Sequence, residues 1–521
     1  MHLNRASPNQ TPQCKSYKID AGSIQSAISR SKNTSACGLD NIPMIFWKQI
    51  SSVIAAPLAH LFNMFLNQSF VPDIWKTAII RPIFKQKGCK NDVSNYRPIA
   101  ITCSLSKVFE KIINKILIEN VGNKISKFQF GFKQNTSTIC NLLYSYTIIQ
   151  RFLDSKQICD LVLFDFAKAF DKVDYRILIT KLQKLDADPL IVNIIIEFLS
   201  KRRQLVLING TFSDVVPVTS GVPQGTVLGP ILFSIYINDL LESNFKTHRS
   251  AFADDLKAFG KPGPDLQHDI NLIYNWSVLN KIALNTDKCV VLHFGKKNPK
   301  ATYYINAAPI NCSGDSRDLG VLIDSDLSFE SHALIISKKC YRLINCLFRL
   351  FNNKRASLYI DLFNIYVNPI IAYGSILYGN ASIGIIEKIE KIMRYFTRRL
   401  WLRCCSSEVP SFSSRLTFFN LQSLEEQRIR SDMIFSFCLI RGLINIPDYS
   451  ITFSTVSSHR IAVQRVQTRQ GQRAFYHRSS ILWNRLIRDN SFRIQSIAQF
   501  KSFISSLNLI PLLEGRALKA S

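Results

Sequence analysis

Two adjacent carboxylates, Asp254 and Asp255, stand between apolar segments in the stretch SAFADDLKAF (250–259). The flanking segments predict two strands of a hairpin with both acids at its tip. Neighbouring carboxylates repel each other and lose hydration near a core, so two ionised groups here cost free energy. A divalent cation reverses that balance because it becomes the largest local charge. The pair therefore favours a fold that brings a cation to the hairpin tip, although an ordinary solvated turn can carry the same residues.

A third acid, Asp165, closes the apolar run ICDLVLFDF (158–166), which predicts a buried strand. A buried strand rarely ends on an acid unless that acid faces something positive. Mg²⁺ prefers oxygen ligands and is commonly bound by one or two carboxylates together with substrate phosphates. Two such ions, about 3.5–4 Å apart, activate an attacking hydroxyl and stabilise a leaving pyrophosphate. Asp171 and Asp174, which follow, also fit first-turn helix acids that the macrodipole favours.

The formal net charge of +28 and the pI of about 9.7 indicate a partner that is a polyanion, most simply nucleic acid. A basic ribosomal or membrane-surface protein would show the same excess. Basic residues outnumber acidic ones most clearly after Tyr341, and arginines alternate with aromatics in RIAVQRVQTRQGQRAFYHRSSILWNRLIRD (460–489). This pattern predicts a surface that faces nucleic acid, with a merely basic surface as the alternative.

Several classes of protein are disfavoured. The 13 cysteines are scattered without a C-x-x-C pair, so neither a zinc knuckle nor a disulfide framework is expected, and reduced thiols of an intracellular protein fit better. The polar amino-terminal stretch is no secretory signal. The most apolar runs fall short of the ~20 residues that cross a bilayer, so we expect no membrane insertion.

Local patterns predict both helices and strands. The expected helices lie at 24–70, 104–121 with Ser104 or Ser106 as cap, 175–185, 230–241 beginning with Pro230, 269–285, and through most of the chain after Tyr341. The expected strands lie within 77–102, at 158–166, in a hairpin that turns at Asn209-Gly210, and at 289–295.

Three segments in order, FDFAKAFDKVD (164–174), SGVPQGTVLGPILFSIYINDL (220–240) and FADD (252–255), resemble the palm motifs of reverse transcriptases. The likeness is to the enzymes of non-LTR (LINE-type, jockey-like) retrotransposons, and further matches extend it over nearly the whole chain. These are ACGLDNIP (36–43), NYRPIAITCSLSKVFEKII (95–113), FQFGFKQNTST (128–138), LNTDKCVVLHFG (284–295), DLGVLIDSDLSFESH (318–332) and RSSILWNRLIRDNSFRIQSIAQFKSFI (478–504).

The resemblance implies an α+β right-hand polymerase with fingers, an antiparallel-sheet palm, a helical thumb and a mostly helical basic C-terminal region. The implied domains are an N-terminal helical extension (1–66), fingers and palm (67–335), thumb (336–450) and basic C-terminal region (451–521).

It also implies roles for individual residues. Asp165, Asp254 and Asp255 would hold two Mg²⁺ ions, with Mn²⁺ as an alternative, and Lys288 would protonate the departing pyrophosphate. Lys85 and Arg97 would clamp the triphosphate, Phe170 would exclude a 2′-hydroxyl, and Gln224 with Gly225 would contact the nascent base pair. Each also has a plainer interpretation: Phe170 fits helix packing, Lys85 surface charge, and G-V-P-Q-G a turn before a helix.

Departures from the family pattern are conservative. Thr226 replaces a serine, Cys289 a threonine and Lys133 an arginine, so no catalytic group is lost. Nothing resembles the endonuclease or the cysteine–histidine knuckle of longer relatives, which suggests a 5′-truncated element and an endonuclease supplied in trans.

The predicted function is RNA-directed DNA polymerase: dNTPs are added to a primer 3′-hydroxyl by two-metal phosphoryl transfer during retrotransposition. The partners would be an RNA template, a DNA primer, their hybrid and dNTPs, without a membrane, and the life cycle of such elements implies the nucleus. The alternatives are a catalytically idle remnant and a maturase-like RNA-binding protein.

Overall fold

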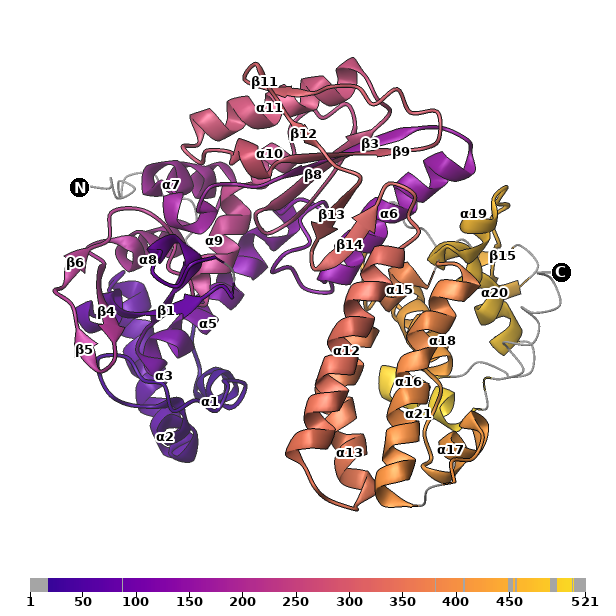
Figure 1. The fold of residues 1–521 in the computed structure, drawn as a ribbon. Helices are drawn as coiled ribbons and strands as arrows, with labels where there is room; N and C mark the ends of the chain where they lie inside the picture. The colour runs from indigo at the N-terminus through magenta and orange to yellow at the C-terminus, as the bar shows by residue number, and fades with distance from the viewer. Residues whose placement is uncertain are drawn as a thin grey trace. The chain divides into compact units, whose positions relative to one another are not determined.

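The computed structural model describes residues 17–86, 88–379, 381–405, 408–447, 453–454, 457–487, 494–507 and 509. The chain divides into two compact units, each formed by separate segments. Unit 1 comprises Met1–Phe132, Asp165–Asn244 and Asn271–Asn285, and unit 2 comprises Lys133–Phe164, Phe245–Ile270 and Thr286–Ser521. Both contain helices and sheet (Figure 1), so the predicted α+β class is confirmed.

Unit 1 begins with helices that pack through aromatic residues. The ring of Phe62 lies 5.0 Å from that of Phe109 and 6.1 Å from that of Trp75. The helices of this part are α1 (Ala21–Ser29), α2 (Met44–Gln49), α3 (Ser51–Asn67), α4 (Asp73–Lys76) and α5 (Ser104–Val121), with short 3₁₀ helices η1 (Val93–Asn95) and η2 (Gly122–Lys124).

The predicted cap of α5 is wrong. The N-cap residue is Cys103, and no side chain caps the helix there. Ser104 is already the first helical residue, and the Ser106 hydroxyl donates to Glu110 Oε1 (3.1 Å). Both serines lie inside the first turn, so neither occupies the N-cap position from which a side chain meets the free N–H groups.

Unit 1 also contains a five-stranded sheet, formed by strands from its first and second segments. Its strands are β1 (Thr77–Phe84), β2 (Tyr96–Ile101), β4 (Arg203–Ile208), β5 (Thr211–Phe212) and β6 (Val216–Pro217). β1 pairs antiparallel with β2 and parallel with β4. Asn209 (φ 49°) and Gly210 (φ 84°) form the predicted two-residue turn between β4 and β5, where both positions need positive φ.

The remaining helices of unit 1 are η3 (Ala169–Lys172), α7 (Tyr175–Lys184), α8 (Pro189–Leu199), α9 (Leu228–Tyr236) and α10 (Asn238–Leu241). Asp174 is the N-cap of α7, accepting from the N–H groups of Arg176 and Ile177, in agreement with its plainer interpretation. Pro230 does not start its helix, because α9 begins two residues earlier, at Leu228.

Unit 2 is built on a sheet with strand order β12–β9–β3–β8–β7. β3 (Cys159–Phe164) pairs antiparallel with β8 (Asp255–Gly260) and β9 (Val290–Phe294), β8 pairs antiparallel with β7 (His248–Phe252), and β12 (Asn311–Cys312) runs parallel to β9. Helix α6 (Thr138–Asp154) packs against β7, β3 and β8. The smaller hairpins are β10 (Tyr304–Ile305) with β11 (Ala308–Pro309) and β13 (Asp315–Asp318) with β14 (Val321–Asp324).

Helix α11 (Pro264–Leu279) ends earlier than predicted. Ile282 already bonds back to Ser277, and the backbone of Ala283 and Asn285 pairs with the segment after β3 instead of continuing the helix. The predicted helix over 269–285 is therefore wrong in its last turn, because the backbone of residues 283–285 pairs with the segment after β3.

The carboxyl-terminal part of unit 2 is helical, as predicted. Its long helices α12 (Glu330–Leu350) and α16 (Ile383–Cys404) lie side by side in Figure 1. The other elements are α13 (Ala356–Leu362), the π-helix η5 (Phe363–Val367), α14 (Asn368–Ala372), α15 (Ser375–Tyr378), α17 (Phe412–Phe418), α18 (Leu424–Ile440), β15 (Phe453–Ser454), β16 (Ser457–Ile461), α19 (Arg469–Arg473), α20 (Phe475–Ile487) and α21 (Ile497–Ser506).

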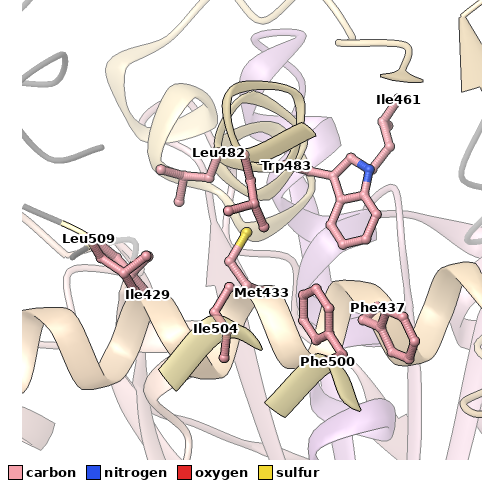
Figure 2. Close-up of a cluster of buried hydrophobic side chains, with 10 residues drawn as sticks. Ile429, Met433, Phe437, Ile461, Leu482, Trp483, Phe500, Ile504 and Leu509 are labelled. Carbon is pink, nitrogen blue, oxygen red and sulfur yellow. The ribbon is translucent and has the colours of Figure 1, made fainter. Parts of the chain in front are cut away.

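Two side chains of the arginine–aromatic stretch, Arg478 and Trp483, are buried, whereas Arg460, Arg465 and Arg469 are exposed. Figure 2 shows α18 presenting Ile429, Met433 and Phe437 to α20 and α21, with Trp483 buried in the same cluster. Arg478 is only 4% exposed, and its guanidinium forms a two-point ion pair with Asp432. For these side chains the predicted contact with nucleic acid is wrong.

A buried histidine of α12 makes stability depend on pH. Burial, with a smaller contribution from Arg317, lowers the pKa of His332 to about 4, and its Nδ1 accepts from the Leu322 N–H. The unfolded chain therefore binds an extra proton below its ordinary pKa of about 6.5, and stability is lost as pH falls through that window. We expect the unfolding free energy to drop by about 1–2 kcal/mol more between pH 7 and pH 5 in the native protein than in His332→Gln, measured by urea titration. Equal drops in both proteins would contradict the assignment.

Candidate functional site

The acids Asp254 and Asp255 lie at the tip of a hairpin, as predicted. Phe252 of β7 pairs with Asp255 of β8, which leaves Ala253 and Asp254 as a two-residue turn. Ala253 has φ of 57°, a left-handed conformation that costs free energy for a residue with a Cβ. Asp254 is half-buried and Asp255 is exposed. The turn thus keeps both carboxylates at the edge of the sheet.

Lys288 lies at the same edge. It ends the short 3₁₀ helix η4 (Thr286–Lys288), and β9 begins two residues later at Val290. Since Val290 pairs with Leu163, near the carboxyl end of β3, the start of β9 and the β7–β8 turn share one edge of the sheet. Unit 2 therefore brings Asp254, Asp255 and the exposed Lys288 to the same end of its sheet, where β8 and β9 begin.

Asp165 is the first residue after β3 and the first residue of the second segment of unit 1. Its backbone carbonyl accepts from the Asn285 N–H (2.7 Å), and the Ala167 N–H donates to Ala283 (2.9 Å). On the sheet side, the last pair of β3 with β8 is Phe164 with Leu256. The next residues along the two strands are Asp165 and Asp255, respectively.

The loop around Gln224 is held by contacts that only glycine allows. Gly225 has φ of 113°, and a Cβ there would lie 2.5 Å from the Ala100 carbonyl oxygen. The Ala100 N–H donates to the Gln224 carbonyl (2.8 Å), so the loop rests on β2. Glycine at 225 is therefore required by close backbone approach as well as by dihedral angle.

The Gln224 amide has a partner that the sequence did not indicate. Its Nε2 donates to Asp171 Oδ1 (3.1 Å). Burial raises the pKa of Asp171, while the Gln224 hydrogen bond and nearby lysines, including Lys85, oppose that rise. The sequence indicated Asp171 only as a helix acid, yet it orients the Gln224 side chain. The two residues lie too far apart in the sequence for a local pattern to predict their contact.

Phe170 is fixed by two aromatic neighbours in unit 1. Its ring stacks on Phe233 (centroids 4.4 Å apart, planes at 20°) and meets the edge of Phe132 (6.3 Å). The residue is half-buried. Such packing holds a ring in one orientation, which both the predicted gate and plain helix packing would require.

Lys85 and Arg97 lie on the two arms of the β1–β2 hairpin. Ile83 pairs with Arg97, and the Lys85 N–H donates to the Asn95 carbonyl (2.8 Å). The Lys85 ammonium donates to the Ser94 carbonyl (2.8 Å), and Arg97 is exposed. The predicted hairpin is confirmed, with one cation on each arm.

A buried carboxylate, Glu110 of α5, anchors the glycine-rich loop to its helix. Its Oε2 accepts from the N–H groups of Val227 and Leu228 (3.2 Å for the latter) at the start of α9, and it is 1% exposed. Burial raises the pKa of Glu110, whereas these two hydrogen bonds and Arg202 lower it. Sequence reasoning missed Glu110 because its partners lie more than a hundred positions away.

Within the described part of the chain, no group of three or more His, Cys, Asp or Glu side chains gathers as a metal site. Carboxylates at a sheet edge still fit Mg²⁺, which needs only one or two of them when phosphates complete its shell. None of the described helices combines the length and apolar character needed to span a bilayer. None of the described cysteines is in a disulfide.

Comparison with known proteins supplies the class. Residues 85–318 match the family model described as reverse transcriptase (RNA-dependent DNA polymerase). The chain is 27% identical over 420 residues to a probable RNA-directed DNA polymerase from transposon BS of Drosophila melanogaster, covering 75% of this chain and 45% of that protein. It is 27% identical over 363 residues to the RNA-directed DNA polymerase from mobile element jockey of the same species, covering 66% and 39%. The chain thus spans less than half the length of these relatives.

Among solved structures, telomerase from Candida tropicalis aligns with 88% of this chain and 74% of that chain, at 11% identity and a TM-score of 0.40. By class, residues 85–318 are therefore a reverse transcriptase domain. The relatives that the chain matches are RNA-directed DNA polymerases of non-LTR retrotransposons, the likeness that the sequence motifs predicted.

Proposed function

We propose that this chain is an RNA-directed DNA polymerase that extends a DNA primer on an RNA template by two-metal phosphoryl transfer. The observation that carries the proposal is the sheet edge of unit 2, where a strained turn presents Asp254 and Asp255 and Asp165 directly follows the adjacent strand β3. Family membership supports the same reaction.

In this proposal Asp165 and Asp254 bind the metal ions, and Asp255 contributes less because it is the more exposed acid. Two Mg²⁺ ions held there (Mn²⁺ as an alternative) would activate the primer 3′-hydroxyl and neutralise charge on the leaving pyrophosphate. Lys288, the last residue of η4, would give a proton to that pyrophosphate.

The incoming dNTP would be held by the residues that the family resemblance implies. Lys85 and Arg97 would contact its triphosphate, for which the planar guanidinium offers two-point geometry. Gln224, oriented by Asp171, would contact the nucleotide, and the backbone at Gly225 allows close approach. Template and primer would be bound chiefly through phosphates, with the hybrid recognised by shape.

The deciding experiment is primer extension on poly-rA/oligo-dT with dTTP and Mg²⁺. We expect products longer than the primer and no extension when EDTA replaces Mg²⁺. Binding should weaken linearly in log affinity against log salt concentration. Salt-sensitive binding without any dTTP incorporation would overturn the polymerase proposal and support an idle remnant or a maturase-like binder.

In the cell we propose that an endonuclease acting in trans supplies the primer end, and that the reaction takes place in the nucleus.

The Phe170 ring gives a separate prediction about sugar choice. If it blocks a 2′-hydroxyl, Phe170→Val should raise the efficiency of rNTP incorporation relative to dNTP by about tenfold or more, since the clash is removed. Phe132→Leu, which changes only the neighbouring ring, serves as the matched control. An unchanged rNTP-to-dNTP ratio, measured by single-nucleotide extension, would leave Phe170 as a packing residue.

A further inference from the structure

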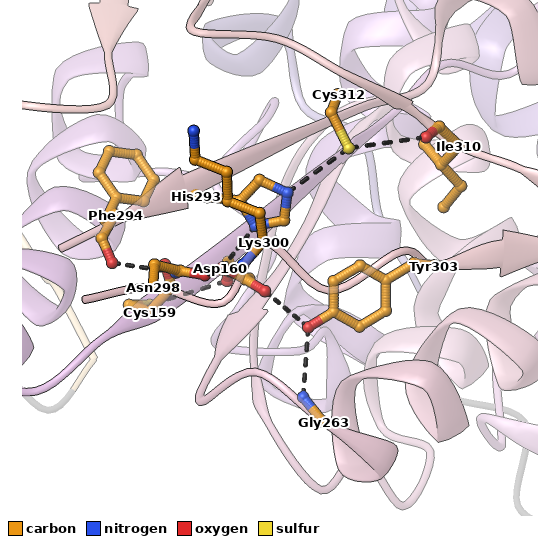
Figure 3. Close-up of polar contacts among 10 residues, drawn as sticks. All are labelled: Cys159, Asp160, Gly263, His293, Phe294, Asn298, Lys300, Tyr303, Ile310 and Cys312. Atoms are coloured by element: carbon orange, nitrogen blue, oxygen red, sulfur yellow. Dashed lines mark hydrogen bonds and ion pairs between the residues drawn. The ribbon is translucent and has the colours of Figure 1, made fainter. Parts of the chain in front are cut away.

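A second cluster of reactive side chains lies within the sheet of unit 2, on the strands β3, β9 and β12. Figure 3 shows Asp160, His293 and Cys312 in line, one from each strand. Asp160 of β3 pairs with His293 of β9, and Cys312 of β12 pairs with Val291, two residues before His293 on β9. His293 Nδ1 lies 2.8 Å from Asp160 Oδ1, and its Nε2 lies 3.5 Å from Cys312 Sγ. The three groups form a thiol–imidazole–carboxylate relay.

The carboxylate of this relay is held in place by two further donors. Asp160 is fully buried and accepts from the Tyr303 hydroxyl (2.7 Å) and from Asn298 Nδ2 (2.7 Å). Burial and the hydrogen bond to Asp160 raise the pKa of Tyr303, so its hydroxyl remains a donor at neutral pH. A carboxylate facing Nδ1 fixes the imidazole proton on that nitrogen, which leaves the Nε2 lone pair directed at the thiol.

The thiol is the accessible end of the relay. Cys312 is exposed, whereas the side chains of His293 and Asp160 are 6% and 0% exposed. A thiol beside a base that a third group orients is the arrangement of an activated nucleophile. Cys89 is also exposed, and among the described residues its Sγ accepts only from the Asn91 N–H, so it offers an internal comparison. The polymerase reaction proposed above uses none of these residues.

We propose that Cys312 is a peroxide-reactive thiol for which His293 acts as the base and Asp160 as the positioning residue. His293 Nε2 takes the thiol proton, and the sulfur attacks one oxygen of hydrogen peroxide. The S–O bond forms as the O–O bond breaks, and the proton returns to the departing hydroxide as water. The thiol is oxidised by two electrons to a sulfenic acid, and the peroxide is reduced to water.

The test uses the full, reduced chain with limiting hydrogen peroxide, and dimedone traps each sulfenic acid for quantification by peptide mass spectrometry. We expect Cys312 to be labelled about tenfold or more faster than Cys89 in the same sample. The fully buried Cys159 should remain unlabelled and so reports that the sheet is folded. Equal rates at Cys312 and Cys89 would overturn the proposal.

His293→Gln removes the base and is expected to lower the Cys312 rate to that of Cys89, with Cys89 itself unchanged. If labelling of Cys159 shows that this variant is unfolded, Tyr303→Phe replaces it, because it removes only one donor to Asp160. That variant is expected to give an intermediate Cys312 rate. An unchanged Cys312 rate in whichever variant is folded would overturn the relay, and neither result depends on polymerase activity.

Discussion

Asp254→Asn is expected to abolish primer extension, lowering the rate by about a thousandfold or more. The substitution keeps the size of the side chain and the turn at Ala253, but a neutral amide is a poor ligand for a hard cation. Under the proposed mechanism the site would lose the ion that stabilises the developing charge, the largest contribution expected in such a reaction. The measurement is single-turnover extension on poly-rA/oligo-dT.

Two companion measurements make this result specific. Binding of the template–primer by Asp254→Asn should stay within about twofold of the native protein, because one charge contributes little to a contact with many phosphates. Asp315→Asn removes the same charge from an exposed residue of β13 and should leave the rate unchanged. A similar loss in both variants would indicate a general charge effect and remove the metal role from Asp254.

Breaking the ion pair between Lys257 and Asp318 should produce the largest loss of stability. Lys257 Nζ lies 2.6 Å from Asp318 Oδ2, and the two residues are 1% and 4% exposed. The Tyr146 hydroxyl also donates to Asp318 (2.9 Å), and Lys257 also donates to Asn141. We expect Asp318→Ala to lower the free energy of unfolding by about 3–5 kcal/mol, because it leaves a buried ammonium without its counter-charge. Urea titration gives this value.

The double variant Lys257→Met with Asp318→Leu separates the pair from its surroundings. Replacing both charges with apolar side chains removes the uncompensated group, so most of the lost stability should return. The coupling free energy comes from the cycle of the two single variants and the double variant. A double variant as unstable as Asp318→Ala would show that packing around Tyr146, rather than charge, sets the cost.

The parts of the fold that sequence reasoning reached are those with local signals. The β7–β8 hairpin shows alternating apolar strands around two acids, and the β4–β5 turn shows Asn-Gly, so both were predicted with their turns. The start of α9 was missed because Glu110, from a distant helix, binds its first N–H groups and moves the start ahead of Pro230. The helix propensity of neighbouring residues cannot predict a contact with a residue so far away in the sequence.

The site divides in the same way. The motifs that contain Asp254, Asp255, Gln224 and Gly225 are each contiguous in sequence. The hairpin turn of the two acids and the glycine-rich loop around Gln224 could therefore be predicted. The partnership of Gln224 with Asp171 was not, since neither position signals the other. Trp483 and Arg478 show the opposite error: a basic aromatic stretch suggested nucleic acid, but burial against α18 uses those same side chains.

The interleaving of the two units also governs how the protein can be made. The chain passes between them after Phe132, Phe164, Asn244, Ile270 and Asn285, so no single cut yields either unit as a continuous fragment. During translation unit 1 lacks its last segment until Asn285 has left the ribosome, although most of its residues emerge much earlier. Expression of an amino-terminal piece that ends before Asn285 should therefore give a chain with exposed apolar surface that depends on chaperones. A boundary placed beyond Asn285 includes all three segments of unit 1 and should avoid this exposure.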